Sequence, residues 1–386
     1  MAGTGAIGDA DGAVASAQFF APRGVALDAV GNIYISDSGN DKIRKISNGI
    51  VSTLISSGLN NPRGLEVIGS TLYIADSENN AIKTVSIDGG IVTLVKNEGL
   101  NDPRSIVSSN DGTILYIGDN GSHRVLALDL ATTALSVIVG SGENLYAEGT
   151  GESASFENLW GITRSGNNLY VSDHNLQLID RVRKINLSTK NTELIYQDTR
   201  QQEMIFPAGL AVKDGYIYVM NAGMGTIQKF NLDDPSDNAR FAGKDRFGNT
   251  VGPKEEAVLG RPNDLALSPD RQWLYVSMNN MVRKINRETG EVIHVLGSVV
   301  DNYRGESTDA EFVRFSGAAN LTVNADGTKL YVIDRWNNRI RGIDLTANPP
   351  KSFLITGAGL INTNGTQDNG YQEGKNCGDV RTTGQA

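Results

Sequence analysis

Short apolar runs of four to six residues recur along the whole chain, separated by turns rich in Gly, Asn and Asp. The runs are rich in Val, Ile, Leu and Tyr, which suit a pleated, half-buried surface. Asn-Gly, Asp-Gly and Gly-Asn pairs between the runs are typical of tight hairpin turns. Between the runs, no stretch keeps a helical apolar period for three turns. The pattern therefore predicts an all-β protein.

The runs belong to a repeated unit. Each copy has a Pro-x-Gly-like turn, an apolar run, a Gly or Asp turn, the motif Tyr-aliphatic-x-Asp, and a segment that ends in aliphatic-Arg/Lys. The first three copies start at Pro22, Pro62 and Pro103, and looser copies start at Leu159, Pro207 and Pro262, while the seventh has lost both Pro and Gly. The tyrosines that mark the seven copies are Tyr34, Tyr73, Tyr116, Tyr170, Tyr218, Tyr275 and Tyr331. Their uneven spacing indicates one repeat with inserted loops of variable length.

A further apolar run follows each copy, which gives four strands per repeat: VSTLI, IVTLV, LSVIV, TELIY, ARFAG, EVIHVLG and SFLIT. Units of four antiparallel strands cannot bury both faces alone, and radial packing around an axis solves this. Seven copies predict a seven-bladed β-propeller.

These repeats resemble the NHL-repeat family of β-propellers. The likeness lies in the Pro-x-Gly start, the GN-(I/L)-Y-(I/V)-x-D core and the N-x-x-I-R close, and it is clearest in Pro22–Lys45 and Asp326–Arg341. The resemblance covers nearly the whole chain and implies the fold. It does not assign an activity, because the family contains binding scaffolds and a few enzymes.

The Asp of Tyr-x-x-Asp is present in five copies but is replaced by Asn221 in the fifth and Met278 in the sixth. We interpret these aspartates as structural acceptors that cap the turn that follows them. The basic residues that close the units are interpreted as strand-edge or blade-to-blade partners: Arg44, Lys83, Arg124, Arg183, Lys229, Arg283 and Arg341.

The two ends fall at the same phase of the repeat. Residues Ala2–Phe20 resemble the segments near Gly151 and Gly305, and we expect all three to connect an outermost strand to the next innermost strand. Residues 1–361 are predicted to form one propeller domain, and residues 362–386 a Gly-rich mobile tail or the start of a further connection. Either the like ends meet and close the ring, or the chain is a piece of a longer protein; the second interpretation is slightly favoured.

Composition and charge exclude several classes of protein. The 386 residues carry 35 Lys plus Arg against 44 Asp plus Glu, a net charge of −9, which argues against binding nucleic acid by charge alone. No apolar run is long enough to span a membrane. The single cysteine, Cys377, excludes an internal disulfide and a Cys-based zinc finger. The chain as given shows no signal sequence, so the compartment stays open. The resemblance to Gly- and Asn-rich NHL propellers, which are often exported, implies an extracellular or periplasmic location with the signal absent from this sequence. We expect a monomer or a part of a larger chain.

The mouth of the central channel is the predicted binding site. The residue after each Pro opens an innermost strand, so these side chains should ring one mouth: Arg23, Arg63, Arg104, Trp160, Ala208, Asn263 and Ala319. Three guanidinium groups beside an indole suit a carboxylate, phosphate or sulfate ligand, or an acidic peptide. Arg23, Arg63, Arg104, Trp160 and Asn263 are therefore the candidate ligand-binding residues. The alternative is that these arginines pair only with neighbouring backbone or carboxylate groups.

Catalytic hypotheses find less support in the sequence. The resemblance extends to the lyase half of peptide-amidating enzymes, which implies zinc-binding histidines at the post-Pro position, but no post-Pro residue here is His. The three histidines, His123, His174 and His294, fall in different repeats. No Gly-x-Ser-x-Gly motif is present, and we assign no cofactor, metal site or catalytic residue. The sequence favours a non-catalytic recognition propeller that binds a protein, a glycan or a small anionic ligand. A metal-dependent lyase or hydrolase, and a structural spacer of a larger extracellular protein, remain the alternatives.

Overall fold

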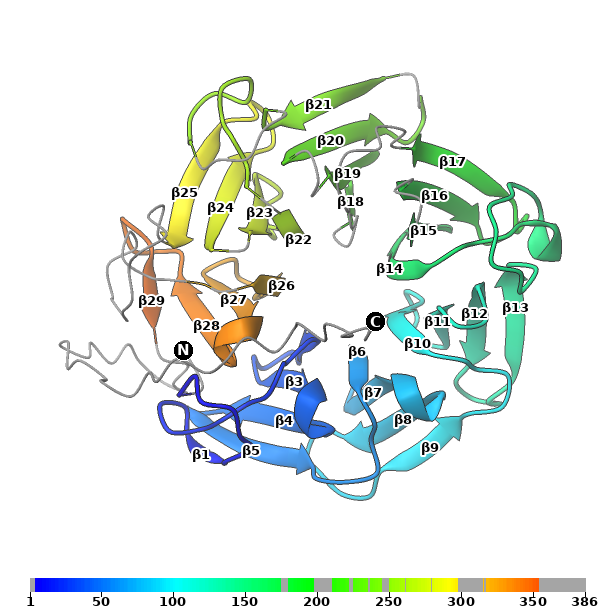
Figure 1. The fold of residues 1–386 in the computed structure, drawn as a ribbon, viewed down its shortest axis with the longest axis horizontal. Helices are drawn as coiled ribbons and strands as arrows, with labels where there is room; N and C mark the ends of the chain where they lie inside the picture. The colour runs from blue at the N-terminus through cyan, green and yellow to red at the C-terminus, as the bar shows by residue number, and fades with distance from the viewer. Residues whose placement is uncertain are drawn as a thin grey trace, which may run out of the picture.

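The computed structural model describes residues 4–174, 180–197, 210–221, 225–234, 237–244, 250–260, 262–278, 280–297, 315 and 317–353. These residues form seven antiparallel sheets arranged radially around a central axis (Figure 1). The prediction of a seven-bladed, all-β propeller is confirmed. The predicted segment 362–386, together with Pro207 and Ala208, lies outside the described residues. The described part of the chain contains no helix long and apolar enough to cross a membrane.

The strands follow chain order within each blade, from the axis outward. Blade 1 has β2 (Val25–Leu27), β3 (Ile33–Asp37), β4 (Lys42–Ser47) and β5 (Ile50–Ile55), with β1 (Gly12–Ala13) added outside β5. Blade 2 has β6 (Pro62–Ile68), β7 (Thr71–Asp76), β8 (Ala81–Ser86) and β9 (Thr93–Lys96). Blade 3 has β10 (Pro103–Ser108), β11 (Ile114–Asp119), β12 (Arg124–Asp129) and β13 (Leu135–Val139). Blade 4 has β14 (Leu159–Ser165), β15 (Asn168–His174), β16 (Asp180–Asn186) and β17 (Thr192–Gln197).

The remaining blades repeat this order. Blade 5 has β18 (Leu210–Lys213), β19 (Tyr216–Asn221), β20 (Thr226–Asn231) and β21 (Asn238–Ala242). Blade 6 has β22 (Pro262–Leu267), β23 (Trp273–Met278), β24 (Met281–Asn286) and β25 (Val292–Gly297). Blade 7 has β26 (Ala318–Val323), β27 (Lys329–Asp334), β28 (Arg339–Asp344) and β29 (Lys351–Phe353). Single 3₁₀ turns lie at η1 (Ser38–Asn40), η2 (Ser77–Asn79), η3 (Gly151–Ser153) and η4 (Arg335–Asn337).

The ring closes on itself. Each innermost strand contacts the innermost strand of the next blade, and β26 of blade 7 contacts β2 of blade 1. The hydrophobic core lies between blades, where buried side chains of adjacent sheets pack face to face. At the closure, Ile35 and Ile46 of blade 1 share one cluster with Ile333 of blade 7. This burial of apolar surface between sheets is what makes the four-stranded units stable together.

The N-terminal segment forms the joint between blades 7 and 1. Its Ile7–Phe19 bridge has the same parallel form as the Asn144–Phe156 bridge between blades 3 and 4. The guanidinium of Arg339 in blade 7 donates a hydrogen bond to the carbonyl of Thr4. The prediction that Ala2–Phe20 is a blade connection is confirmed for its described part.

The recurring aspartates of the Tyr-x-x-Asp motif are buried and structural, but the backbone N–H groups that they accept differ from those we predicted. Asp37 accepts the backbone N–H of Phe20 at 2.7 Å, and Asp76 accepts that of Asn60 at 2.7 Å. These donors precede the innermost strand; the turn after the Asp contributes only a side chain, as Asn40 Nδ2 does to Asp37 at 2.8 Å. Each Asp therefore fixes the entry of its own innermost strand rather than capping the following turn.

The basic residues that close the repeats do not all occupy the same position in the third strand of their blades. Arg44, Lys83, Arg183, Arg283 and Arg341 each pair opposite an aliphatic residue of the second strand. Arg44, which is fully buried, binds Asp37 at 3.0 Å and Asp11 at 2.6 Å. Lys229, however, pairs opposite Tyr218, and Arg124 pairs opposite Asp119. Grouping these two with the others was wrong: Lys229 is one residue past the shared position and so points to the opposite face of the sheet, while Arg124 is two residues before it, on the same face but at the start of the strand.

Candidate functional site: the mouth of the central channel

The residue after each Pro lies in a break of the innermost ladder. The register between the first and second strands shifts at this position in blades 2, 3, 4, 6 and 7. A bulge of this kind re-aims a side chain out of the regular alternation of a strand. The repeat therefore sets the same local geometry for Arg63, Arg104 and Trp160.

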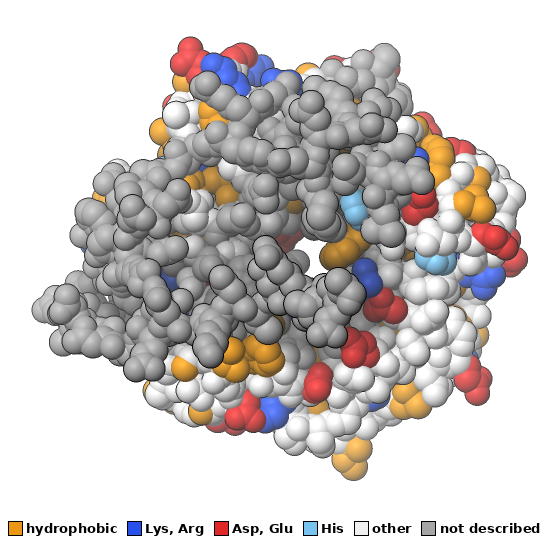
Figure 2. Space-filling view, in the orientation of Figure 1, with side chains coloured by type: hydrophobic (Ala, Val, Ile, Leu, Met, Phe, Trp, Pro, Cys, Tyr) orange, Lys and Arg blue, Asp and Glu red, His pale blue; other side chains and the backbone are white. Residues whose placement is uncertain are grey.

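Hydrogen bonds between blades fix the backbone at the mouth. Ser36 Oγ donates to the carbonyl of Arg63 at 2.9 Å, and Ser77 Oγ to that of Pro103 at 2.6 Å. Glycine permits this close approach: a Cβ on Gly24 would lie 2.0 Å from the carbonyl oxygen of Arg63. The opening strands thus converge with their backbones nearly in contact. Figure 2 shows an opening at the centre of the molecule, with basic, acidic and hydrophobic side chains at its described rim.

Arg23 and Arg63 carry the most unusual electrostatics of the mouth. Both are half-buried, and within the described residues neither guanidinium makes a hydrogen bond or an ion pair. Burial, and then the positive charge of neighbouring arginines, lowers the pKa of each to about 10. Each group still carries its charge at neutral pH, so two neighbouring cations lie here without a carboxylate partner among the described residues.

Arg104 and Trp160 form a second, internally satisfied part of the mouth. Arg104 binds the carboxylate of Asp102 through Nε at 2.8 Å and through Nη2 at 2.6 Å. Its guanidinium carbon lies 5.1 Å from the centroid of the Trp160 ring, a cation–π distance. Arg104 thus follows the alternative in which a post-Pro arginine pairs with a neighbouring carboxylate, and Trp160 is half-buried against it.

A fourth arginine, Arg335, joins the mouth and was not foreseen from the sequence. It directly follows Asp334, and the same position in blade 1 is Ser38, whose Oγ donates to the carbonyl of Pro62 in the next blade at 2.5 Å. The blade after blade 7 is blade 1, so Arg335 comes beside Arg23, where their like charges lower the pKa of Arg23. The sequence signal for Arg335 was its position directly after the Asp of Tyr-x-x-Asp. The sequence alone does not show that this position lies beside the next blade at the mouth.

The other post-Pro positions add little charge. Asn263 Nδ2 donates to the carbonyl of Ala318 at 2.7 Å, so its amide joins blades 6 and 7. The next residue, Asp264, accepts the backbone N–H of Leu321 at 3.0 Å. Enclosure of its carboxylate raises the pKa of Asp264 to about 7. The structure thus brings Arg23, Arg63, Arg104 and Trp160 to one region, while Asn263 is turned to a structural contact.

The histidines do not converge on a metal site. His123 Nδ1 lies 2.6 Å from the carbonyl of Glu157 and joins blades 3 and 4. His174 is buried at the end of β15, and His294 lies in the outermost strand of blade 6. Among the described residues, no three His, Cys, Asp or Glu side chains come together as a metal site would require.

Comparisons with known proteins agree with this architecture. No family model matches the chain. Two curated relatives carry the name NHL repeat-containing protein 2: the one from Bos taurus is 23% identical over 376 residues and 86% of this chain, and the one from Homo sapiens is 25% identical over 307 residues and 67% of it. These alignments cover 48% and 40% of the relatives, so the chain spans less than half the length of the curated relatives it matches.

Solved structures show the same fold at low identity. A catalytically inactive virginiamycin B lyase from Staphylococcus aureus with quinupristin superposes with a TM-score of 0.62, at 12% identity, over 86% of this chain and 97% of that one. Hydrazine synthase of Kuenenia stuttgartiensis gives 0.59, at 14% identity, over 84% and 96%. An auxiliary nutrient binding protein from Bacteroides thetaiotaomicron gives 0.53, at 15% identity, over 74% and 69%.

Seven radial sheets of four antiparallel strands, closed by contact of the first and last blades, define a β-propeller. The repeat motif and the curated relatives indicate which class of β-propeller this is. The chain is an NHL-repeat β-propeller.

Proposed function

We propose that this propeller is a non-catalytic recognition module whose channel mouth binds an anionic group of a protein, a glycan or a small ligand. The observation that carries the proposal is the pair of half-buried guanidinium groups of Arg23 and Arg63, which have no hydrogen bond or ion pair within the described part of the chain. Desolvating a cation without a partner costs free energy, and an anion that binds both groups recovers it.

The surroundings of the two groups favour recognition of a carboxylate, phosphate or sulfate. Arginine presents planar donors that match such oxyanions in a bidentate way. Arg335 adds positive charge, and the Arg104–Trp160 stack supplies an aromatic surface beside it. A concave mouth lined in this way concentrates the field on an incoming anion.

Calorimetric titration tests the proposal with three probes: a hexaglutamate peptide, a heparin disaccharide and citrate. We expect at least one probe to bind saturably, and Arg63→Ala to weaken it by about tenfold or more, the loss of one charge-assisted contact. Lys96→Ala is the charge-matched control, because Lys96 lies in the outer strand β9 with only a 3.8 Å contact to Glu98. Equal affinity of the Arg63 variant and the wild type, or no binding of any probe, would refute the mouth as the site.

A further inference from the structure

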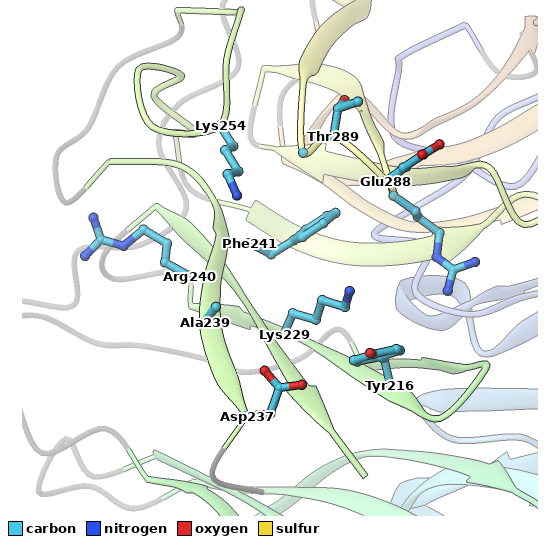
Figure 3. A pocket seen from close by; sticks show the side chains of 11 residues that line it. Tyr216, Lys229, Asp237, Ala239, Arg240, Phe241, Lys254, Glu288 and Thr289 are labelled. Carbon is cyan, nitrogen blue, oxygen red and sulfur yellow. The ribbon is translucent and has the colours of Figure 1, made fainter. Parts of the chain in front are cut away.

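A second cavity lies away from the mouth, at the joint between blades 5 and 6. Its volume is about 260 Å³, and its lining includes Tyr216, Lys229, Phe241, Lys254 and Arg287. Figure 3 shows Lys229 and Lys254 reaching into this space from different elements, with Phe241 between them. Residues 287–290, in the turn after β24, line the same cavity.

The cavity is at the opposite end of the blades from the mouth. In blade 6, Pro262 at the mouth pairs with Met278, while Leu267 at the other end of the strand pairs with Leu274. The turn that contributes Arg287 follows Asn286, which pairs with Trp273 at this far end. The cavity and the mouth are therefore separate sites.

Lys229 is the central group. Its ammonium lies 3.9 Å from the centroid of the Tyr216 ring and 5.9 Å from that of Phe241. It makes no hydrogen bond or ion pair with any described residue. Burial, followed by the positive charge of Arg287, lowers the pKa of Lys229 below its usual value. The ammonium is thus held against aromatic rings with Arg287 nearby, and the charge of Asp237 only partly offsets this effect on its pKa.

Comparison with blade 1 shows what differs at this joint. Lys45 occupies the same place opposite Tyr34, but its Nζ donates to the carbonyl of Ile87 in the next blade at 2.6 Å. The residue of blade 6 that corresponds to Ile87 is Arg287, whose Nε donates to Tyr218 Oη at 3.2 Å. In blade 5, Lys229 makes no such bond with a described residue, and the side chain of Arg287, which pairs with Asp214 at 3.1 Å, lines the cavity beside it.

Lys254 completes the site and is positioned by packing. A Cβ on Gly290 would lie 2.7 Å from Lys254 Cδ, so the lysine stem lies directly on the glycine of the turn. The nearest carboxylate to its ammonium is Glu255, at 3.6 Å and largely exposed. Asp237 and Glu288 also line the cavity, but neither lies within ion-pair distance of Lys229 or Lys254.

From this geometry we infer a second binding site at the blade 5–6 joint, specific for a small sugar-like ligand that carries a phosphate- or sulfate-ester group. The ester oxygens would accept hydrogen bonds from Lys229 and Lys254, with Arg287 adding charge. The body of the ligand would pack against Phe241 and Tyr216. The volume is below the range of about 300–1,000 Å³ typical of drug-sized ligands, which suits a monosaccharide-sized molecule.

Calorimetry at low ionic strength, with glucose 6-phosphate and glucose 6-sulfate in separate titrations, tests this inference. We expect saturable binding of at least one ester, and the ester that binds identifies the source of the anion. Lys229→Met should weaken binding by about tenfold or more, since it removes a charge-assisted hydrogen bond. Lys229→Arg keeps the charge and should stay within about threefold of the wild type, which separates loss of binding from loss of folding.

Two controls make the result specific. Lys284→Met removes the equivalent lysine of blade 6, which lies 4.2 Å from the Trp273 ring centroid, and should leave ester binding unchanged. Arg63→Ala at the mouth should also leave it unchanged, so this site and the proposed mouth function succeed or fail separately. Absence of binding of both esters, or equal affinity of wild type and Lys229→Met, would overturn the inference.

Discussion

At the scale of single residues, the buried Asp37–Arg44 ion pair shows how charged side chains of the repeat stabilise a blade. Both side chains are fully buried, and the carboxylate also accepts the N–H of Phe20. Removal of the Asp37 carboxylate would leave the buried Arg44 with Asp11 as its remaining carboxylate and the Phe20 N–H without its acceptor, which costs about 2–4 kcal/mol. We therefore expect Asp37→Ala to lower the free energy of unfolding by about this amount in urea denaturation.

Asp37→Asn is the matched comparison. An amide keeps an oxygen that accepts the Phe20 N–H, and blade 5 carries Asn221 at the same place in the repeat. The loss should be clearly smaller than for Asp37→Ala. Equal stability of wild type and Asp37→Ala would contradict the structural role.

Asp264 predicts a dependence of stability on pH. Enclosure raises its pKa to about 7 in the folded protein, above an unfolded value of about 4, so the folded state binds more protons between these pH values. The contribution of Asp264 to stability is therefore greatest below pH 4 and falls as the pH rises toward 7. Asp264→Asn removes this titration while keeping an acceptor for the Leu321 N–H.

Urea denaturation of both proteins at pH 4.5 and pH 7.5 measures the effect. The stability of Asp264→Asn relative to the wild type should increase from the lower to the higher pH. The same relative stability at both pH values would show that the carboxyl titrates normally.

At the scale of elements, the innermost strands depend on glycine where blades approach. A Cβ on Gly24 would lie 2.0 Å from the carbonyl oxygen of Arg63, while a Cβ on Gly64 would lie 2.9 Å from that of Arg104. Gly24→Ala should therefore lower the free energy of unfolding by about 3 kcal/mol, and Gly64→Ala by about 1 kcal/mol. Chemical denaturation of the two variants provides the comparison. The reverse order, or two neutral variants, would contradict the packing described for the mouth.

The strands and connections also show which features of the fold could be predicted from the sequence. The seven strand groups and the role of the N-terminal segment as a blade connection could be predicted, because turn residues and apolar runs are local signals. The placement of Lys229 could not. Gln228 and Lys229 are adjacent in a strand, and only the register with Tyr218 decides which of them faces the joint. Arg335 was missed for a different reason: its neighbour Arg23 comes from blade 1, which is the most distant blade in sequence.

At the scale of the whole molecule, the closing joint uses the same contact as the other joints. The backbone N–H of Ala21 donates to Asn338 Oδ1 at 3.0 Å between blades 7 and 1, and that of Asp102 donates to Asn80 Oδ1 at 2.8 Å between blades 2 and 3. Both asparagines have positive φ, near +50°. The ring is thus closed by one more copy of a repeated link.

This equivalence predicts equal energetic cost at the two joints. Asn338→Gly and Asn80→Gly each remove the link but keep a residue that tolerates positive φ, and each should lower the free energy of unfolding by about 1 kcal/mol. Thermal or urea denaturation measures both. A neutral Asn338→Gly beside a destabilised Asn80→Gly would show that blades 7 and 1 are not joined in this way.

The proposed recognition function depends most on the guanidinium groups of Arg23 and Arg63, which have no hydrogen-bond or ion-pair partner among the residues that the structure describes. A crystal structure of the protein in selenate, phased by the anomalous signal of selenium, tests it most directly. The account predicts a selenate ion at the channel mouth, within hydrogen-bond distance of both groups. Guanidinium groups that instead bind acceptors of the protein itself, with no selenate between them, would contradict it.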